Sequence, residues 1–137
     1  MVRHDLNACV RPVLRVAMAA ASLLLAAGSS VAQETGPEAG QIEFNNHCRT
    51  CHTVEKGDNR LGPSLHGIIG REAGALPDYD YSDAMRSSSV VWDEASLDAF
   101  IANPDEVVRG HNMKPFSGIA DPQIRAAIVD YLAAPAP

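Results

Sequence analysis

Hydrophobic residues recur at the spacing of an α-helix in three stretches of this chain. The first is residues 37–49, with Thr35 placed to cap it and Pro37 in its first turn. In residues 93–102 the apolar positions share one face, and Asn103-Pro104 ends the pattern; they are Leu97, Phe100 and Ile101. The third is residues 121–133, where a capping Asp121 and Pro122 precede a stripe of Ile124, Ile128, Tyr131 and Leu132.

The rest of the chain shows little regular pattern. We expect a short helix at 82–87, and no window alternates with the period of a strand, so no real sheet is predicted. Residues 53–81 are mostly Gly, Pro, Asp and short polar runs, and a loop of that length is either functional or poorly ordered. The predicted fold class is all-α, with three main helices and long loops around a thin core.

The N-terminal segment has the pattern of an export signal. Arg3, Arg11 and Arg15 accompany an apolar run at residues 16–27, and small residues follow, so we expect residues 1–32 to be cleaved after Ala32. An uncleaved anchor helix is the alternative, but this run is shorter than the roughly 20 residues of a membrane span. The predicted mature domain is residues 33–137, delivered to an oxidising compartment.

Composition and charge indicate a globular domain and argue against a nucleic-acid-binding protein. The 137 residues are 46% hydrophobic and 20% charged, which fits one globular domain plus a leader. Only 5% are aromatic, so another group is needed to fill the core. The formal charge is −6, and removing the leader with its three arginines and Asp5 leaves eight basic and sixteen acidic residues, a charge of −8. Nucleic acid is therefore not an expected partner.

Residues 48–52, Cys-Arg-Thr-Cys-His, form the pattern of covalent haem attachment. Two thiols three positions apart on one helical turn can reach the two vinyl groups of one porphyrin. The imidazole of His52 can then bind the iron from the same side, and imidazole is a good iron ligand. A porphyrin would also supply the missing core volume.

Cys48 and Cys51 have three possible uses other than haem attachment. A thioredoxin-like dithiol requires a strand before the helix, and a zinc site requires a second Cys/His pair at finger-like spacing; neither pattern is present. A structural disulfide is the simplest alternative. Cys9 lies in the leader, so the mature chain retains these two cysteines. The export signal and the adjacent His52 favour haem.

From Gly40 to Leu132 the chain resembles class I cytochrome c of the mitochondrial and bacterial long-loop type. Gly40 and Phe44 match the glycine and aromatic residue of the family's first helix. Residues 62–71, Gly-Pro-Ser-Leu-His-Gly-Ile-Ile-Gly-Arg, match the family's Gly-Pro-x-Leu-His-Gly-x-x-Gly-Arg in full. The later matches are Tyr81, Trp92, Asn103-Pro104, Met113, Arg125, Ile128, Tyr131 and Leu132.

The resemblance implies a class I cytochrome c fold wrapped around one haem c, attached through Cys48 and Cys51. It makes His52 the proximal iron ligand, oriented by the Pro63 carbonyl, and Met113 the distal ligand. Met85, the other methionine outside the leader, is the alternative distal ligand. The resemblance also implies a haem propionate among three donors that would stabilise a buried carboxylate: Arg71, Tyr81 and Trp92.

The segment around Met113 departs from the family pattern. Arg109-Gly110 stands where Pro-Gly is usual, and Phe116 lies three residues after Met113 instead of two, which we interpret as a one-residue insertion. This departure favours the alternative function, a haem enzyme or gas sensor with a displaceable distal methionine. The other histidines outside the leader are expected to be loop or surface residues: His47, His66 and His111.

Ligation by His52 and Met113 leaves iron with no open position, which predicts a one-electron carrier and not an enzyme. The predicted partners are redox proteins of the periplasm: a cytochrome bc complex, a terminal oxidase or a periplasmic dehydrogenase. We expect a monomer that does not span the membrane after cleavage. Lys56 and Lys114 are the lysines of the mature chain, so any positive docking patch is predicted to be small. Association should then depend weakly on salt, unless the partner is basic.

Overall fold

The structure is a computed structural model that describes residues 36–134. The predicted leader and the capping residue Thr35 lie outside this range. The described chain contains five helices: α1 (Pro37–His47), α2 (Asp83–Arg86), α3 (Glu94–Ala102), α4 (Pro104–Val107) and α5 (Pro122–Ala133). Strand pairing within residues 36–134 is limited to one isolated bridge, between Glu72 and Val91. The predicted all-α class is therefore confirmed.

Two of the three main helices, α3 and α5, begin at side-chain caps. Asp93 accepts a hydrogen bond from the backbone of Ser96 at the start of α3, and the Ser96 hydroxyl accepts one from Asp93 N–H in return. Asp121 caps α5 in a similar way, by accepting from Gln123 N–H. At α1, Gly36 occupies the N-cap position without a side-chain hydrogen bond, and the helix ends at His47, two residues earlier than predicted.

Two features of the helix pattern differ from the prediction or refine it. The short helix expected at 82–87 is α2, capped by Ser82. Pro104 was expected to end the helical stretch at 93–102. It does follow the last residue of α3, but it also occupies the first turn of α4, a helix that the pattern did not predict. Proline is well suited to a first helical position, because its missing N–H would have no partner there.

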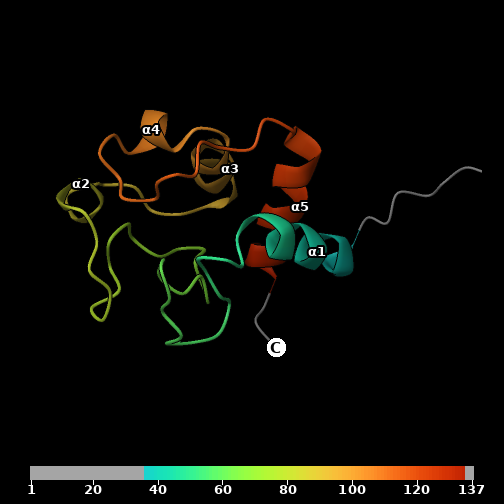
Figure 1. Ribbon diagram of the computed structural model, residues 1–137, viewed down its shortest axis with the longest axis horizontal. Helices are drawn as coiled ribbons and strands as arrows, with labels where there is room; N and C mark the ends of the chain where they lie inside the picture. The colour runs from blue at the N-terminus through green and yellow to red at the C-terminus, as the bar shows by residue number, and fades with distance from the viewer. Residues whose placement is uncertain (1–35, 135–137) are drawn as a thin grey trace, which may run out of the picture. The chain divides into compact units, whose positions relative to one another are not determined.

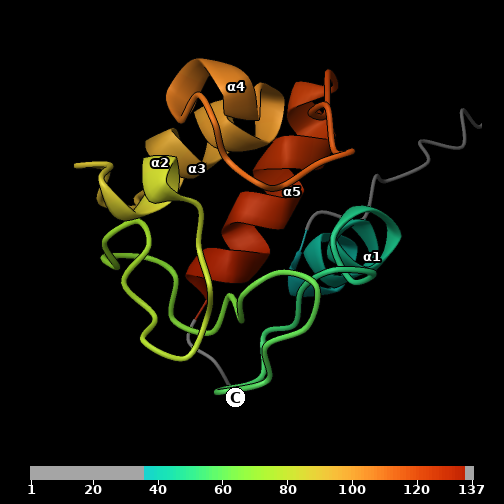
Figure 2. The same cartoon turned by 60° about the vertical axis from the view of Figure 1, so that its left-hand side comes forward.

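Helices α1 and α5 cross in close contact (Figures 1 and 2). The Phe44 and Tyr131 rings lie 5.5 Å apart between centroids. The close approach depends on Gly40, since a Cβ atom there would lie 2.6 Å from Tyr131 Cβ and would also overlap the carbonyl of Ala127. On the other side of α5, the Arg125 guanidinium donates to the Asp98 carboxylate of α3 at 2.8 Å. These contacts fix α5 between α1 and α3.

The long loop between α1 and α2 is held in place by backbone hydrogen bonds. Gly62 N–H donates to the Cys51 carbonyl at 2.8 Å, and Leu65 N–H donates to the Thr53 carbonyl at 2.8 Å. Farther along, Trp92 N–H donates to the Arg71 carbonyl at 2.9 Å. The loop therefore forms one side of the domain, opposite α3 and α4 (Figures 1 and 2). No helix in the described part of the chain is long and apolar enough to cross a bilayer.

Candidate functional site

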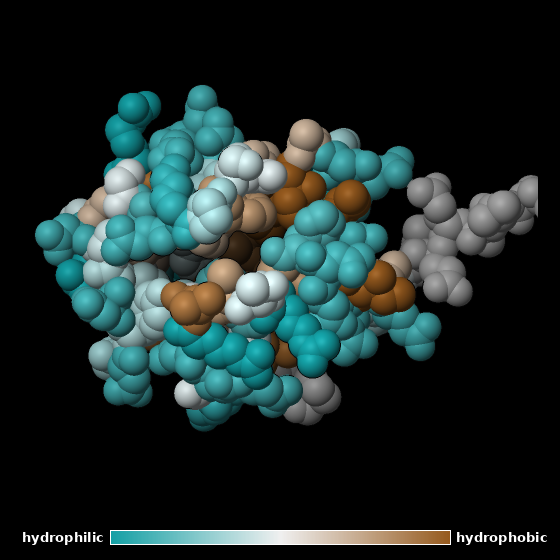
Figure 3. Space-filling model, in the orientation of Figure 1, coloured by the Kyte–Doolittle hydropathy of each residue, from teal (hydrophilic) through white to brown (hydrophobic). Residues whose placement is uncertain are grey.

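A cavity of about 600 Å³ lies between the long loop, the end of α1 and the inner faces of α3 and α5. Its volume falls in the range of pockets that enclose a whole ligand, roughly 300–1,000 Å³. Figure 3 shows a hollow with apolar walls, surrounded largely by hydrophilic residues. All the residues that the sequence suggested for cofactor binding line the cavity: Cys48, Cys51, His52, Pro63, Arg71, Tyr81, Trp92 and Met113.

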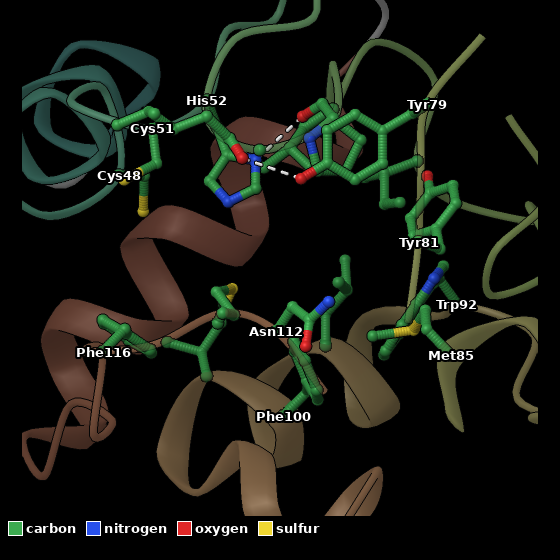
Figure 4. A pocket seen from close by; sticks show the side chains of 18 of the residues that line it. Cys48, Cys51, His52, Tyr79, Tyr81, Met85, Trp92, Phe100, Asn112 and Phe116 are labelled. Carbon is green, nitrogen blue, oxygen red and sulfur yellow. Dashed lines mark hydrogen bonds between the residues drawn. The ribbon is translucent and has the colours of Figure 1, made fainter. Parts of the chain in front are cut away.

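The Cys-x-x-Cys-His segment is a turn that continues from the end of α1. Cys48 is the C-cap of α1, and its carbonyl accepts hydrogen bonds from Cys51 N–H at 3.0 Å and His52 N–H at 2.9 Å. This turn places both thiols and the imidazole on one wall of the cavity (Figure 4). The two sulfurs are not joined by a disulfide. The local structure thus presents two free thiols and one imidazole to the same space.

The state of the thiols argues against two of the other uses. Burial, with a smaller effect from Cys51, raises the pKa of Cys48 to about 12. A redox-active dithiol and a zinc site both need a thiolate, which a low pKa provides. Within residues 36–134, no group of three His, Cys, Asp or Glu side chains gathers as a metal site would require. The raised pKa of Cys48 and the lack of further metal ligands in the described residues do not favour disulfide exchange or a zinc site.

The His52 ring is fixed from two sides. Its Nδ1–H donates to the Pro63 carbonyl at 2.8 Å, which leaves Nε2 facing the cavity (Figure 4). Gly62 packs against the ring so closely that a Cβ atom there would lie 2.6 Å from Nδ1. Burial lowers the pKa of His52, a change that the Pro63 hydrogen bond opposes and Arg71 reinforces. The ring is neutral at pH 7 and has a free nitrogen lone pair, so it could bind haem iron through Nε2.

Arg71 and Tyr81 lie together at another part of the cavity wall. The Arg71 guanidinium donates to the carbonyls of Ser64 at 2.9 Å and His66 at 3.2 Å. Burial lowers the pKa of Arg71 and raises that of Tyr81, while each opposes the shift of the other. Arg71 stays charged and Tyr81 stays a hydroxyl donor at pH 7. Trp92 is buried on the same cavity, with its ring 5.0 Å from Phe100.

The segment after α4 supplies the opposite wall. Met113 and Phe116 are partly buried and both line the cavity. The extra residue after Met113 therefore does not remove the aromatic side chain from the cavity (Figure 4). Met85, at α2, lines the same cavity, so the structure brings both candidate methionines to it.

Sequence reasoning missed one residue of this segment. His111, expected in a loop or at the surface, does lie in a loop, but its side chain is fully buried. Its Nδ1 accepts a hydrogen bond from Met113 N–H at 2.9 Å. The signal available in the sequence was only its position two residues before Met113.

Comparison with known proteins identifies the family of this chain. The sequence profile of cytochrome c matches residues 37–134. The chain belongs to the cytochrome c family. Cytochrome c2 of Rhodopila globiformis is 43% identical over 96 residues, which cover 70% of this chain and 90% of that protein. Cytochrome c2 of Rhodomicrobium vannielii is 37% identical over 121 residues, which cover 88% of this chain and 94% of that protein. The solved structure of cytochrome cH from Methylobacterium extorquens has a TM-score of 0.65 at 38% identity, covering 72% of this chain and 97% of that one.

Family membership confirms the resemblance to class I cytochrome c, the predicted fold and the predicted cofactor. With its Cys48/Cys51 motif, this cytochrome c holds covalent haem c. It is an electron carrier and not an enzyme, and it exchanges electrons with redox partners. The cavity, the two thiols and the neutral His52 fit this cofactor.

Proposed function

We propose that this cytochrome carries single electrons in the periplasm on a haem ligated by His52 and Met113. One observation carries the proposal: both side chains line the cavity that the two thiols of the Cys-x-x-Cys-His turn also face. When bound, haem iron with two protein ligands supplies one-electron redox chemistry. His52 supports this role because Pro63 fixes its tautomer and leaves Nε2 for the iron.

The remaining site residues are proposed to hold the haem and keep water out. Arg71, Tyr81 and Trp92 would receive a propionate, which needs donors once it is buried. The Arg71 guanidinium already donates to two loop carbonyls, so its position is set by the fold. Ile68, Phe100 and Ile128 give the cavity buried apolar walls, which limit the solvent reorganisation that accompanies a change of charge.

Residues 1–32 are proposed to be a cleavable leader, which would place the mature domain, residues 33–137, in the periplasm as a monomer. There its partners would be a cytochrome bc complex, a periplasmic dehydrogenase or a terminal oxidase. The mature chain has a charge of −8. Lys114, one of the two lysines outside the leader, is paired with Asp105. This arrangement supports docking that does not depend on a ring of free lysines.

Absorption spectra of the purified protein in both oxidation states test the proposal. Protein from cells competent in haem maturation should contain haem that resists extraction, because it is joined through Cys48 and Cys51. The oxidised form should show the far-red sulfur-to-iron band of methionine ligation, and the reduced form should not bind carbon monoxide. A missing far-red band with ready carbon monoxide binding would instead support a gas-binding site with a displaceable methionine.

The mass of the protein recovered from the periplasmic fraction tests the leader. Cleavage after Ala32 predicts the mass of residues 33–137 plus one haem. Protein that keeps residues 1–32 and stays with the membrane fraction would contradict the proposed processing while leaving the ligation proposal untouched.

A further inference from the structure

His111 is the most unusual polar residue of the domain outside the haem ligands. Its side chain has no exposed surface, and its ring packs edge-on against Phe100, with the centroids 5.7 Å apart. Its Nδ1 accepts the hydrogen bond from Met113 N–H. Its Nε2 is the one buried side-chain polar atom in residues 36–134 that lacks a hydrogen-bond partner.

Burying such a ring costs free energy, because a buried polar atom without a partner loses its hydration. Asp105 Oδ1 lies 3.4 Å from Nε2 but is not aligned for a hydrogen bond. A leucine of similar size would fill the same space without this cost. The one bond that the ring does make, to the backbone of Met113, is therefore the feature that distinguishes histidine from an apolar residue here.

The bond also fixes the state of the ring. A nitrogen that accepts a hydrogen bond carries no proton, so Nδ1 is unprotonated and the neutral ring carries its proton on Nε2. Asp105, whose other oxygen pairs with Lys114, faces the Nε2 side.

We propose that His111 is a positioning residue for the distal ligand: its Nδ1 holds the backbone of Met113 and thereby directs the thioether into the haem cavity. The ring joins three parts of the molecule. Phe100 anchors it to α3, Asp105 lies beside it at α4, and the hydrogen bond extends this anchorage to the ligand loop. The loop around Met113 has no regular secondary structure, so such an anchor replaces the rigidity that a helix would provide. This inference rests on the proposed role of Met113 as the distal ligand.

Two polar substitutions of similar size test the position of the acceptor. In His111→Asn the side-chain oxygen can occupy the place of Nδ1, whereas in His111→Gln it reaches the place of Nε2. We expect His111→Gln to bind added imidazole at the haem about tenfold more tightly than the parent, the effect of losing one hydrogen bond. His111→Asn should stay within about threefold of the parent. His66→Leu removes a histidine bonded to the Val54 carbonyl and serves as the control.

Two further readouts separate positioning from a general loss of stability. The far-red band of the oxidised protein should weaken in His111→Gln and persist in His111→Asn. Hydrogen exchange of the Met113 amide should accelerate in His111→Gln alone, while the amides of α5 stay protected. Equal imidazole affinities and equal Met113 exchange rates in the Asn and Gln variants would overturn the inference. If the parent itself lacked the far-red band, the ligation by Met113 would fail instead.

Discussion

The Pro63 carbonyl oxygen accepts a hydrogen bond from His52 Nδ1–H at 2.8 Å. The two residues belong to different segments, the turn after α1 and the long loop, and the bond joins them across the base of the cavity. Gly62 N–H bonds to the Cys51 carbonyl beside it. The loop therefore orients the imidazole, and its close contact with the ring can be tested directly.

Gly62→Ala should disturb the His52 ring, because the new Cβ atom would overlap it. Overpacking of this kind costs about 1–3 kcal/mol, and the displaced ring should also alter the haem spectrum. Denaturant unfolding of the haem protein and its absorption spectrum measure both effects. Gly36→Ala is the matched control, since nothing lies within 4 Å of a Cβ atom at Gly36. Identical unfolding curves for the parent and Gly62→Ala would contradict the contact.

The two methionines of the cavity should differ sharply when replaced. Met113→Ala should abolish the far-red band, allow carbon monoxide to bind the reduced haem and lower the reduction potential, since methionine ligation raises it. Met85→Ala should keep the band, because the ligand is retained. Spectra and redox titrations of the two variants decide between them. The reverse pattern would assign the distal position to Met85.

The lowered pKa of Asp93 predicts that its contribution to the stability of α3 depends on pH. Hydrogen bonds from Ser96, chiefly from its backbone N–H, lower the pKa of Asp93 from its ordinary 3.8. In acid the unfolded chain takes up a proton first, so the stabilisation is complete above about pH 3.8 and is lost as the pH falls through the lower folded-state value.

The variant Asp93→Asn isolates this effect. Asparagine is also a good N-cap but does not titrate, so its stability should decline less than that of the parent at acid pH. Urea unfolding midpoints measured from pH 6 down to pH 2.5 give the comparison. Parallel pH profiles for parent and variant would show that the carboxylate contributes nothing through its lowered pKa.

Local signals explain which parts of the fold could be predicted from the sequence. Asp93 and Asp121 mark the starts of α3 and α5, because a cap acts on N–H groups two or three residues away. Helix α4 was not predicted, because Pro104 was interpreted only as a helix stop. Proline also suits the first turn of a new helix, which is its place in α4. The sequence placed Gly40 in a helix, but its close contact with Tyr131 of α5 involves a residue far along the chain and could not be predicted from the helical pattern.

The same contrast between local signals and long-range packing applies to the site. The spacing of Cys48, Cys51 and His52 is local, and one turn brings them together, so the sequence alone predicted their chemistry. The burial of His111 could not be predicted, because it arises from packing against Phe100 in α3. The convergence of Met113 and His52 on one cavity also depends on how α3 and α5 pack, which the helical pattern does not specify.

Charge predicts how the cytochrome should exchange electrons with small reagents. The mature chain has a charge of −8 from eight basic and sixteen acidic residues. Four of the basic side chains, all within residues 36–134, are paired with carboxylates: Arg60 with Asp58, Arg86 with Asp80 and Asp83, Lys114 with Asp105, and Arg125 with Asp98. Lys114 lines the cavity, and its pairing with Asp105 offsets a positive charge at the edge of the haem site.

A cationic and an anionic inorganic oxidant should therefore respond oppositely to salt. The rate with the cationic oxidant should fall several-fold as ionic strength rises from about 0.01 to 0.2 M, because screening weakens attraction over that range. The rate with the anionic oxidant should rise or stay flat as repulsion is screened. Stopped-flow kinetics of the reduced protein measure both. A steep fall with the anionic oxidant would instead reveal a positive field around the haem edge, because the local field there would then outweigh the acidity of the whole chain.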